Sequence, residues 1–396
     1  MGGILVAVWY ILLPLAVFVD YYLSFPFWDG LVTVSVLWSI CLYFWFSGNL
    51  ILASKVPLVE RWIPYDRRVR LHIATGLAIM GALVWHVLSK FLGNMEIDWL
   101  SWVLLFGCGA FLVMSATWTK MPLLGTLRSL LGKRWSGLTN RFYDGLRRVH
   151  GLGFAALVAL SWWHIHSAGI DAMGVSGLSV AWAGAAILSL GVYLASWFRK
   201  MLAAEATLSA IEVRSDLVLL TLDLRTPLAY HAGQFAYLRF PGISGLRSGH
   251  PFSFLSAPDA EGGGMVLHFA IKPQGDFTQA LRTLKVDARV LINGPYGNFR
   301  PQPGEKNLLI GTGIGSVPVL SLLAGYDEGQ HNWQAIVAVA KAEDLPRVPE
   351  GDNVMLMEYA KDGRLIDKSL LNGVMGGSPD WHVWICASTK VRQALL

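Results

Sequence analysis

Long apolar runs recur through the first half of the chain and stop near Arg199. Six of them are roughly 17 to 25 residues long, which is enough for a helix to cross a hydrocarbon core about 30 Å thick. They fall at about 4–20, 30–53, 69–89, 100–118, 147–167 and 176–198. This pattern predicts a membrane α-helical bundle of six transmembrane helices over residues 1–200.

The second half of the chain has the shorter periods of a domain that folds outside lipid. From Ala203 to about Arg300, segments such as QFAYLRFPG and MVLHFAIKP alternate apolar and polar residues, which predicts an antiparallel β-barrel over residues 201–303. From Asn307, the strand NLLIG is followed by a glycine-rich turn, an apolar helix and further strands. Such alternation is typical of an α/β nucleotide-binding domain, expected here over residues 304–396.

Composition and charge support a membrane protein. A hydrophobic content of 54% with only 15% charged residues is too apolar for an ordinary soluble enzyme. The net charge of +5 does not indicate nucleic acid as a partner, because the basic residues crowd beside the apolar runs. Alternate loops place fourteen Lys and Arg residues on one side and only Lys90 on the other. The excess predicts a multi-pass protein of the cell membrane whose amino terminus and soluble half are cytoplasmic.

Two of the predicted spans carry matched pairs of histidines. His72 and His86 lie on the third span, His150 and His164 lie on the fifth, and each pair is separated by fourteen residues. Fourteen residues advance a helix by about 21 Å and return it to nearly the same face. A single histidine of this kind can be a core residue that hydrogen bonds between helices. Two matched pairs instead predict two bis-imidazole sites, His72 with His150 and His86 with His164.

Neutral imidazole is a normal axial ligand of haem iron, and two such ligands leave no open coordination position. These sites therefore predict two haem b groups, one near each side of the bilayer, that transfer electrons without binding substrate at iron. His166 lies only two residues beyond His164 and points to another face of the helix. We expect it at the outer mouth of the bundle, where Trp85, Ser89 and Lys90 would form an acceptor pocket with it.

Three short motifs follow one another in the soluble half. The first is His250-Pro251-Phe252-Ser253. The second runs from Lys272 to Gly275-Asp276-Phe277-Thr278. The third is Gly311-Thr312-Gly313-Ile314-Gly315, directly after a predicted strand. An aromatic ring beside a hydroxyl suits a flat isoalloxazine, and a glycine-rich turn before a helix suits an anionic nucleotide.

These motifs, in this order and with the two histidine pairs, resemble those of the NADPH oxidase and ferric reductase family. The resemblance implies a ferric reductase-like transmembrane domain fused to a ferredoxin reductase-type dehydrogenase. It implies that the first motif binds the flavin of FAD, the second its pyrophosphate, and the third NADPH. The compact form is similar to that of the prokaryotic members, and no obligatory protein partner is evident.

The nicotinamide end of the site departs from the family pattern. The last strand gives Cys386-Ala387-Ser388 where the family usually has Cys-Gly-Pro, and Cys386 is expected beside the nicotinamide. A 2′-phosphate requires a basic partner, for which Lys341 and Arg364 are the candidates. Both residues are equally compatible with solvated surface charges, so NADPH is preferred and NADH stays possible.

The sequence therefore predicts an enzyme that transfers electrons from cytoplasmic NADPH, through FAD and two haems, to dioxygen on the outer side, producing superoxide. A ferric or other metal reductase with an external ferric complex as acceptor is the alternative. A haem-binding sensor with a vestigial soluble half is a third interpretation, against which the intact flavin and nucleotide motifs argue. A methionine sulfoxide repair cytochrome has similar haem spans but lacks a fused dehydrogenase.

Overall fold

The computed structural model describes residues 2–24, 30–97, 99–118, 143–167, 176–214, 216–258, 263–301, 304–325, 332–341, 343, 345, 351–363, 366–378 and 380–395. The chain divides into two compact units, residues 1–198 and 199–396. Each unit is described by itself.

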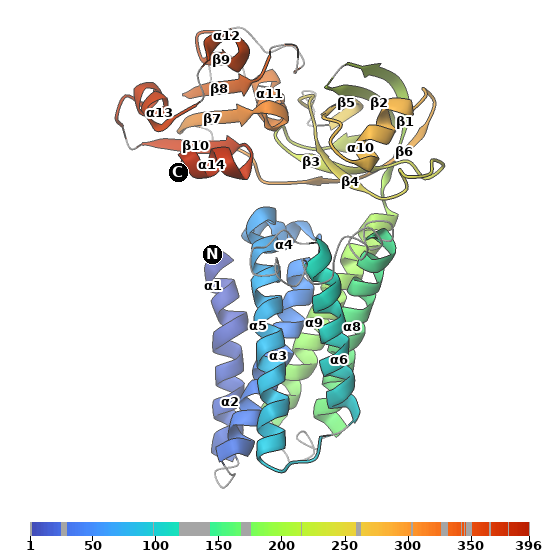
Figure 1. The fold of residues 1–396 in the computed structure, drawn as a ribbon, viewed down its shortest axis with the longest axis vertical. Helices are drawn as coiled ribbons and strands as arrows, with labels where there is room; N and C mark the ends of the chain where they lie inside the picture. Colours follow the sequence, from blue (N-terminus) through green and yellow to red (C-terminus); the bar gives the residue numbers. More distant parts are fainter. Residues whose placement is uncertain are drawn as a thin grey trace. The chain divides into compact units, whose positions relative to one another are not determined.

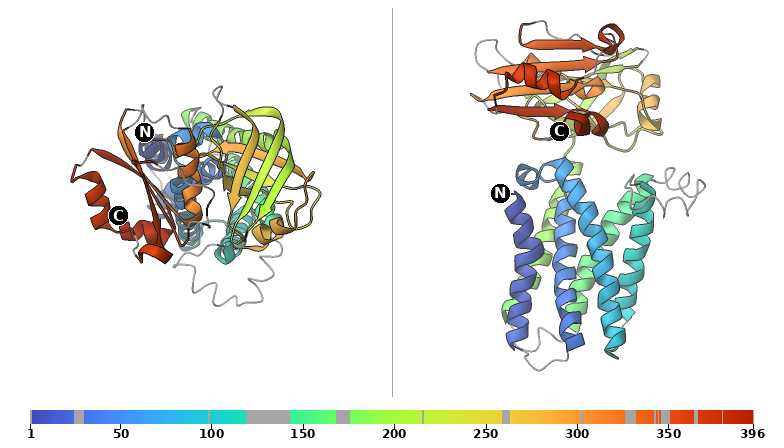
Figure 2. Two further views of the ribbon diagram at one scale, coloured as in Figure 1. Left: turned by 90° about the horizontal axis from the view of Figure 1, so that it is seen from above. Right: turned by 60° about the vertical axis from the view of Figure 1, so that its left-hand side comes forward.

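The first unit consists of helices that run side by side (Figures 1 and 2). Its described elements are α1 (Gly2–Ala7), η1 (Val8–Leu12), α2 (Leu13–Ser24), α3 (Gly30–Ala53), α4 (Pro57–Trp62), α5 (Tyr65–Leu92), α6 (Trp99–Trp118), α8 (Tyr143–Ser167) and α9 (Ser176–Met201). The first three form one continuous helical rod in which η1 is a π-helical turn. The prediction of a helix at each of the six apolar runs is confirmed.

Four described stretches are long and apolar enough to cross a membrane: Gly2–Ser24, Gly30–Ala53, Arg67–Leu92 and Val180–Met201. Helix α6 contributes a shorter apolar stretch, Trp99–Phe111. Helix α8 carries three histidines, which lower its apolar character although it has 25 residues. Six membrane spans therefore remain a prediction, and several apolar helices are what the structure shows.

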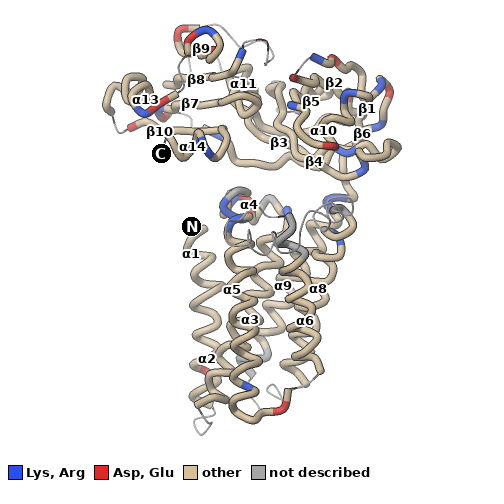
Figure 3. Tube along the Cα trace, in the orientation of Figure 1, with Lys and Arg blue, Asp and Glu red and all other residues tan. Residues whose placement is uncertain are grey.

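Helix α3 is the central element of this unit, because it packs against α2, α5 and α8. One apolar cluster joins Phe46 of α3, Leu83 of α5 and Leu157 of α8. Burial of these large side chains is compatible with a tightly packed bundle. Figure 3 shows that the basic positions of this unit gather near α4 and the beginning of α5, in agreement with the charge asymmetry of the sequence.

The second unit begins with a six-stranded antiparallel sheet in the order β4-β3-β6-β1-β2-β5. Its strands are β1 (Ala204–Val213), β2 (Val218–Ala229), β3 (Phe235–Arg239), β4 (His250–Ser253), β5 (Gly263–Ile271) and β6 (Arg289–Tyr296). The sheet curls around a core that includes Phe240, Phe254 and Phe269. Beyond β4, Phe254 bridges Phe269, and the N–H of Leu255 donates to the carbonyl of His268 at 2.8 Å. The antiparallel sheet is confirmed, whereas the link between its edges is this short bridge and not the full ladder of a closed barrel.

A four-stranded parallel sheet follows, in the order β10-β7-β8-β9. Its strands are β7 (Lys306–Thr312), β8 (Trp333–Val339), β9 (Val354–Glu358) and β10 (Trp381–Cys386). The helices are η4 (Gly313–Ser316), α11 (Val317–Ala324), α12 (Tyr359–Asp362), α13 (Lys368–Met375) and α14 (Thr389–Leu395). Leu309 packs on the side of α11, while Leu308 and Ile310 pack on the side of α13 and α14. The α/β arrangement is confirmed.

Candidate functional site

The parallel sheet has one point where its strand order reverses. The chain proceeds outward from β7 to β8 and β9, and then returns to place β10 on the other side of β7. Ligands of open α/β sheets bind at such a switch point, outside the carboxyl ends of the strands. The carboxyl ends of β7 and β10 carry the third motif and Cys386, whose backbone pairs with Gly311. The structure therefore brings these sequence-predicted residues together.

Close packing explains the glycines of the third motif. A β-carbon built on Gly315 would lie 2.4 Å from the carbonyl oxygen of Cys386, and one built on Gly311 would lie 2.6 Å from Cα of Ser316. Gly313 has a φ of +54°, which an L side chain rarely adopts. Thr312 ends β7 and Ile314 packs partly against Val317. A side chain at Gly315 would therefore push the turn away from β10, and the glycines let the backbone of the turn lie close to the end of that strand, as a glycine-rich nucleotide turn requires.

The candidate residues around this crevice differ in environment. Burial raises the pKa of the Cys386 thiol, so this group stays protonated over a wider pH range than an exposed thiol. Lys341 follows β8 and is 63% exposed, with Nζ 3.4 Å from Oε1 of Glu343. An exposed ion pair of this kind is weak and does not hold Lys341 away from a phosphate. Arg364 lies outside the described residues.

The first and second motifs meet in the antiparallel sheet. The ring of His250 stacks on Phe277, with centroids 3.9 Å apart, and Phe252 lies parallel to Phe277 at 6.0 Å. Pro251 pairs with Tyr237 and Ser253 pairs with Phe235, because β4 runs antiparallel to β3. Phe277 itself is buried in the core, so it supports the other two rings from below. Phe252 is half-buried, so part of its ring stays accessible.

The turn of the second motif is folded by its own threonine. Oγ1 of Thr278 accepts hydrogen bonds from the backbone N–H groups of Gln274 and Gly275, at 2.9 Å each. These bonds begin the short helix α10 (Asp276–Ala280), whose first residue is acidic. Lys272 lies with Nζ 3.8 Å from Oδ2 of Asp216. The motif thus presents one cation and a hydrogen-bonded turn, which is the chemistry that its assignment to a pyrophosphate requires.

Two aromatic residues of β3, Phe235 and Tyr237, were missed in the sequence. Tyr237 and Tyr296 lie 5.6 Å apart, Phe235 and Tyr296 lie 5.9 Å apart, and the Tyr296 hydroxyl donates to Oδ1 of Asn293. The alternation in QFAYLRF was the available signal, because it places Phe235 and Tyr237 on the same face of β3. Because Phe252 pairs with Ala236, these rings lie on the other face of the two strands from Phe252, beside Pro251 and Ser253.

The segment before β3 meets the segment between β6 and β7 at Gly233 and Phe299. Gly233 has a φ of +83°, and a β-carbon there would lie 2.2 Å from the carbonyl oxygen of Phe299. Phe299 packs edge-on against Trp384 at 5.8 Å, and Trp384 donates to Oδ1 of the buried Asn307. These contacts fix the flavin sheet against the nucleotide sheet.

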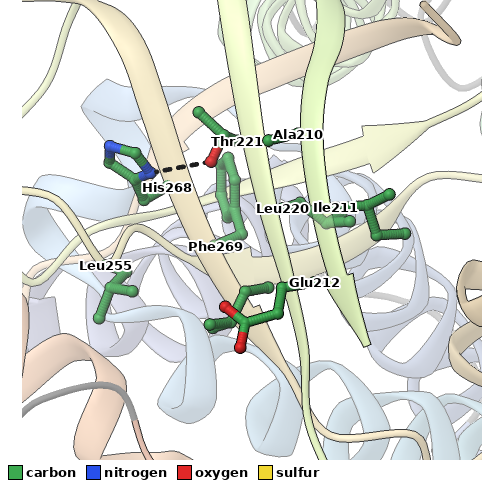
Figure 4. A pocket seen from close by; sticks show the side chains of 9 residues that line it. Ala210, Ile211, Glu212, Leu220, Thr221, Leu255, His268 and Phe269 are labelled. Carbon is green, nitrogen blue, oxygen red and sulfur yellow. Dashed lines mark hydrogen bonds between the residues drawn. The ribbon is translucent and has the colours of Figure 1, made fainter. Parts of the chain in front are cut away.

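A further pocket lies on β1, β2 and β5 and contains none of the predicted site residues. Figure 4 shows Thr221 and His268 at this pocket, with Oγ1 of Thr221 3.2 Å from Nδ1 of His268. Its walls are otherwise mostly apolar and it carries no cluster of groups for redox chemistry. The binding of flavin and nucleotide by the three motifs stays a prediction, and this pocket offers no rival site for it.

In the helical unit, the structure brings His72 and His150 together. Their ring centroids lie 6.2 Å apart with an interplanar angle of 82°, although they come from α5 and α8. His150 also packs against Phe111 of α6, at 5.3 Å. His86 and His164 lie fourteen residues further along the same two helices. Two imidazoles that face each other between helices fit the axial ligand set of a haem iron.

The expected acceptor pocket needs one correction. Ser89 is buried, and its hydroxyl donates to the carbonyl of His86 at 2.9 Å, so its side chain belongs to the helix and does not line a pocket. His166 is exposed, and its ring stacks on Trp162 with centroids 5.7 Å apart and an interplanar angle of 7°. Trp85 is 48% exposed. A shared acceptor surface of Trp85, Lys90 and His166 stays a prediction.

Comparison with known proteins defines the class of the second unit. Residues 201–300 match a family model described as an FAD-binding domain. This range contains the curled sheet with both flavin motifs. A flavin domain followed by an α/β nucleotide domain makes this half of the chain a flavin-dependent NAD(P)H oxidoreductase.

The chain is homologous to respiratory burst oxidase proteins, which are NADPH oxidases. It is 30% identical over 175 residues to respiratory burst oxidase homolog protein A of Arabidopsis thaliana, covering 35% of this chain and 19% of that protein. It is 26% identical over 133 residues to the probable dihydroorotate dehydrogenase B (NAD(+)) electron transfer subunit of Methanocaldococcus jannaschii, covering 34% of this chain and 47% of that protein. The matches thus span about a fifth of the plant relative and about half of the archaeal one.

Among solved structures, the cytochrome b5 reductase domain of Ulva prolifera nitrate reductase is similar to half of the chain. The TM-score is 0.41 and the sequence identity is 17%, and the match covers 50% of this chain and 91% of that one.

Proposed function

We propose that this chain is a transmembrane oxidoreductase that carries electrons from cytoplasmic NADPH, through FAD and two b-type haems, to dioxygen on the outer side of a cell membrane. The observation that carries this proposal is the pair His72 and His150, whose rings face each other from two apolar helices of a chain that also has an FAD-binding domain. Electron transfer within a soluble flavin reductase does not require histidine pairs in apolar helices.

In the cytoplasmic half, the residues of the chain bind and orient. The Gly311–Gly315 turn admits an anionic nucleotide at the end of β7, and Cys386 closes the far side of that crevice as a neutral thiol. Phe252, supported by Phe277, offers an apolar face to a flat ring. Bound FAD supplies the conversion of a two-electron hydride donor into single-electron steps.

In the helical half, four imidazoles are the proposed ligands: His72 and His150 for one haem, His86 and His164 for the other. Because each pair is separated by fourteen residues, the two sites lie about 21 Å apart along the helices. A haem held by two such imidazoles would supply one-electron transfer and would leave no open position for oxygen at its iron. The chain therefore delivers electrons to an acceptor outside the iron, which favours superoxide as the product and also permits an external ferric complex.

The exposed stack of Trp162 and His166 supports an acceptor surface near the end of α8. An aromatic surface of this kind does not distinguish dioxygen from a ferric chelate. Ferric reduction therefore stays as the second candidate, and the choice of acceptor is decided by experiment.

The test uses purified, haem-loaded protein in sealed vesicles with NADPH on the cytoplasmic side only. An impermeant superoxide-sensitive dye outside should respond, and superoxide dismutase outside should abolish the response. A response that dismutase does not change, together with reduction of an external ferric chelate, would establish the metal reductase instead. His164→Ala should halve the haem-to-protein ratio from two to one and stop the signal, while His166→Ala, two residues away, should keep both haems. A wild-type ratio below two would refute the four-histidine assignment.

A further inference from the structure

Helix α3 presents two backbone carbonyls to the two histidines of α5. Nδ1 of His86 lies 3.0 Å from the carbonyl oxygen of Ser35, and Nδ1 of His72 lies 3.3 Å from the carbonyl oxygen of Asn49. Ser35 and Asn49 are themselves fourteen residues apart on α3, like the two histidines on α5. The same contact is therefore made twice, once at each predicted haem site.

The acceptor in both contacts determines which ring nitrogen carries the proton. A carbonyl oxygen has no hydrogen to donate, so Nδ1 must be the donor in each bond. The neutral ring is then the Nδ1–H tautomer, in which Nε2 has the lone pair that a metal requires. Hydrogen bonds from the second ring nitrogen of a ligating histidine also fix the ring and increase its basicity.

Side chains of α3 reinforce both contacts. Oγ of Ser35 lies 3.2 Å from Nδ1 of His86, and both residues are buried. Asn49 is 2% exposed, and its Oδ1 accepts a hydrogen bond from Oγ1 of Thr75 at 2.9 Å. Thr75 also lies 2.7 Å from the carbonyl oxygen of Leu71, in the turn of α5 that holds His72. The amide of Asn49 thereby ties α3 to this turn.

Buried polar groups of this kind are unusual in an apolar helix. A polar side chain without a hydrogen bond in such surroundings costs several kcal/mol, so the presence of an amide and a hydroxyl at two positions fourteen residues apart has to be explained. Straight packed helices repeat the backbone contact after fourteen residues, but they do not explain why a hydroxyl and an amide stand at the two contacts. Ser47 is also buried on α3, but its hydroxyl donates to the carbonyl of Phe44 in its own helix, so it serves as a structural serine for comparison.

We propose that α3 is the positioning helix for the α5 ligands: Ser35 sets the tautomer and orientation of His86, and Asn49 sets those of His72. Each residue then tunes one haem and not the other. This inference rests on the proposed function, since it requires that both histidines bind haem. A stronger hydrogen bond from Nδ1 makes the imidazole a better donor and favours ferric iron, so its loss raises the midpoint potential of that haem.

The experiment is a redox titration with low-temperature electron paramagnetic resonance on the full haem-loaded chain. Ser35→Ala should raise one of the two midpoint potentials and shift the low-spin signal of that haem only. Asn49→Leu keeps the carbonyl but loses the hydrogen bond with Thr75 that ties α3 to the turn of His72, so it should shift the potential and the low-spin signal of the other haem. The matched control Ser47→Ala should shift neither haem. The outer haem is identified as the one that His164→Ala removes. Ser35→Thr, which keeps the hydroxyl, should restore the wild-type potential.

Each outcome decides the inference. Two bound haems with unchanged potentials and spectra in Ser35→Ala and Asn49→Leu would overturn the positioning role while leaving the proposed function intact. Shifts of both haems by either variant would overturn the assignment of one residue to one haem. Fewer than two haems in the wild-type protein would instead refute the proposed function. If Ser35→Ala binds no haem, Ser35→Cys replaces it, because a thiol is a weaker acceptor of similar size. Ser35→Cys should bind both haems and give a smaller shift of the midpoint potential in the same direction. No shift in that variant would also overturn the inference.

Discussion

Replacement of Gly315 by alanine tests whether the nucleotide crevice depends on the close contact between the third motif and β10. The new β-carbon would lie 2.4 Å from the carbonyl oxygen and 3.0 Å from the carbonyl carbon of Cys386. Neither partner can retreat easily, because Cys386 pairs with Gly311 in the parallel ladder of β10 and β7. The turn must therefore move away from β10 by several tenths of an ångström or more.

Overpacking of this kind costs typically 1–3 kcal/mol. For a folded unit of 150–250 residues, 1 kcal/mol corresponds to about 2–4 °C in the unfolding temperature, so we expect a fall of about 2–12 °C. The unfolding temperature is measured on the full chain in detergent, from the rise in FAD fluorescence when heating releases the quenched flavin. The dissociation constant for NADPH should also rise, because the displaced turn forms the crevice.

Gly373→Ala is the matched control for this substitution. Gly373 lies exposed within α13, and a β-carbon there meets no described atom within 4 Å. Alanine is a better helix former than glycine, so this variant should be more stable by roughly 0.5–1 kcal/mol. An unfolding temperature of Gly315→Ala equal to or above that of the wild-type protein, with unchanged NADPH affinity, would refute the close-packing argument.

Three further predictions concern single residues of the soluble unit. Because burial raises the pKa of the Cys386 thiol, its alkylation by iodoacetamide should be slow at pH 8 and accelerate only at higher pH. Mass spectrometry follows the reaction, and rapid alkylation of Cys386 at pH 7 would contradict the prediction. Phe277→Ala should cost about 3–5 kcal/mol of stability and weaken FAD binding, since Phe277 is 6% exposed and packs against His250 and Phe252. An unchanged FAD affinity would show that Phe277 does not support the flavin site. Lys341→Gln should raise the KM for NADPH on the order of tenfold with little effect on the KM for NADH, and equal effects on both would identify a plain surface charge.

The helices and strands were predictable because the spacing of apolar side chains follows the period of each element. The run 30–53 coincides with α3 (Gly30–Ala53), and the alternation around QFAYLRF gives β3 (Phe235–Arg239). Helix ends were less well placed: α5 begins at Tyr65, before the apolar run starts, because Arg67, Arg68 and Arg70 continue the helix beyond its apolar part. Charged residues end an apolar run without ending a helix.

Closure of the antiparallel sheet was not predictable in the same way. Alternation shows which face of a strand is buried, but it does not show whether the first and last strands of a curled sheet meet. Among the described residues, the edges meet beyond the end of β4, where Phe254 bridges Phe269 and the N–H of Leu255 donates to the carbonyl of His268. The N–H of His268 also donates to Oγ of Ser256. The short length of β4 (His250–Ser253) is the physical reason, because four residues leave few backbone groups to complete the ladder with β5.

The candidate haem sites show most clearly what a sequence can and cannot indicate. The spacing of His72 and His86 is visible because histidine is rare in an apolar run, but the groups that orient these rings include backbone carbonyls, which every residue has. Only the antiparallel packing of α3 on α5 shows that the carbonyl of Ser35 meets His86 and that of Asn49 meets His72. Since fourteen residues give the same rise and nearly the same rotation on any α-helix, two helices that match at one site must match again at the other. The repeat of the carbonyl contact on α3 is therefore a consequence of straight helices in contact. The sequence adds a polar side chain at each contact, the hydroxyl of Ser35 and the amide of Asn49, and these side chains strengthen the contact.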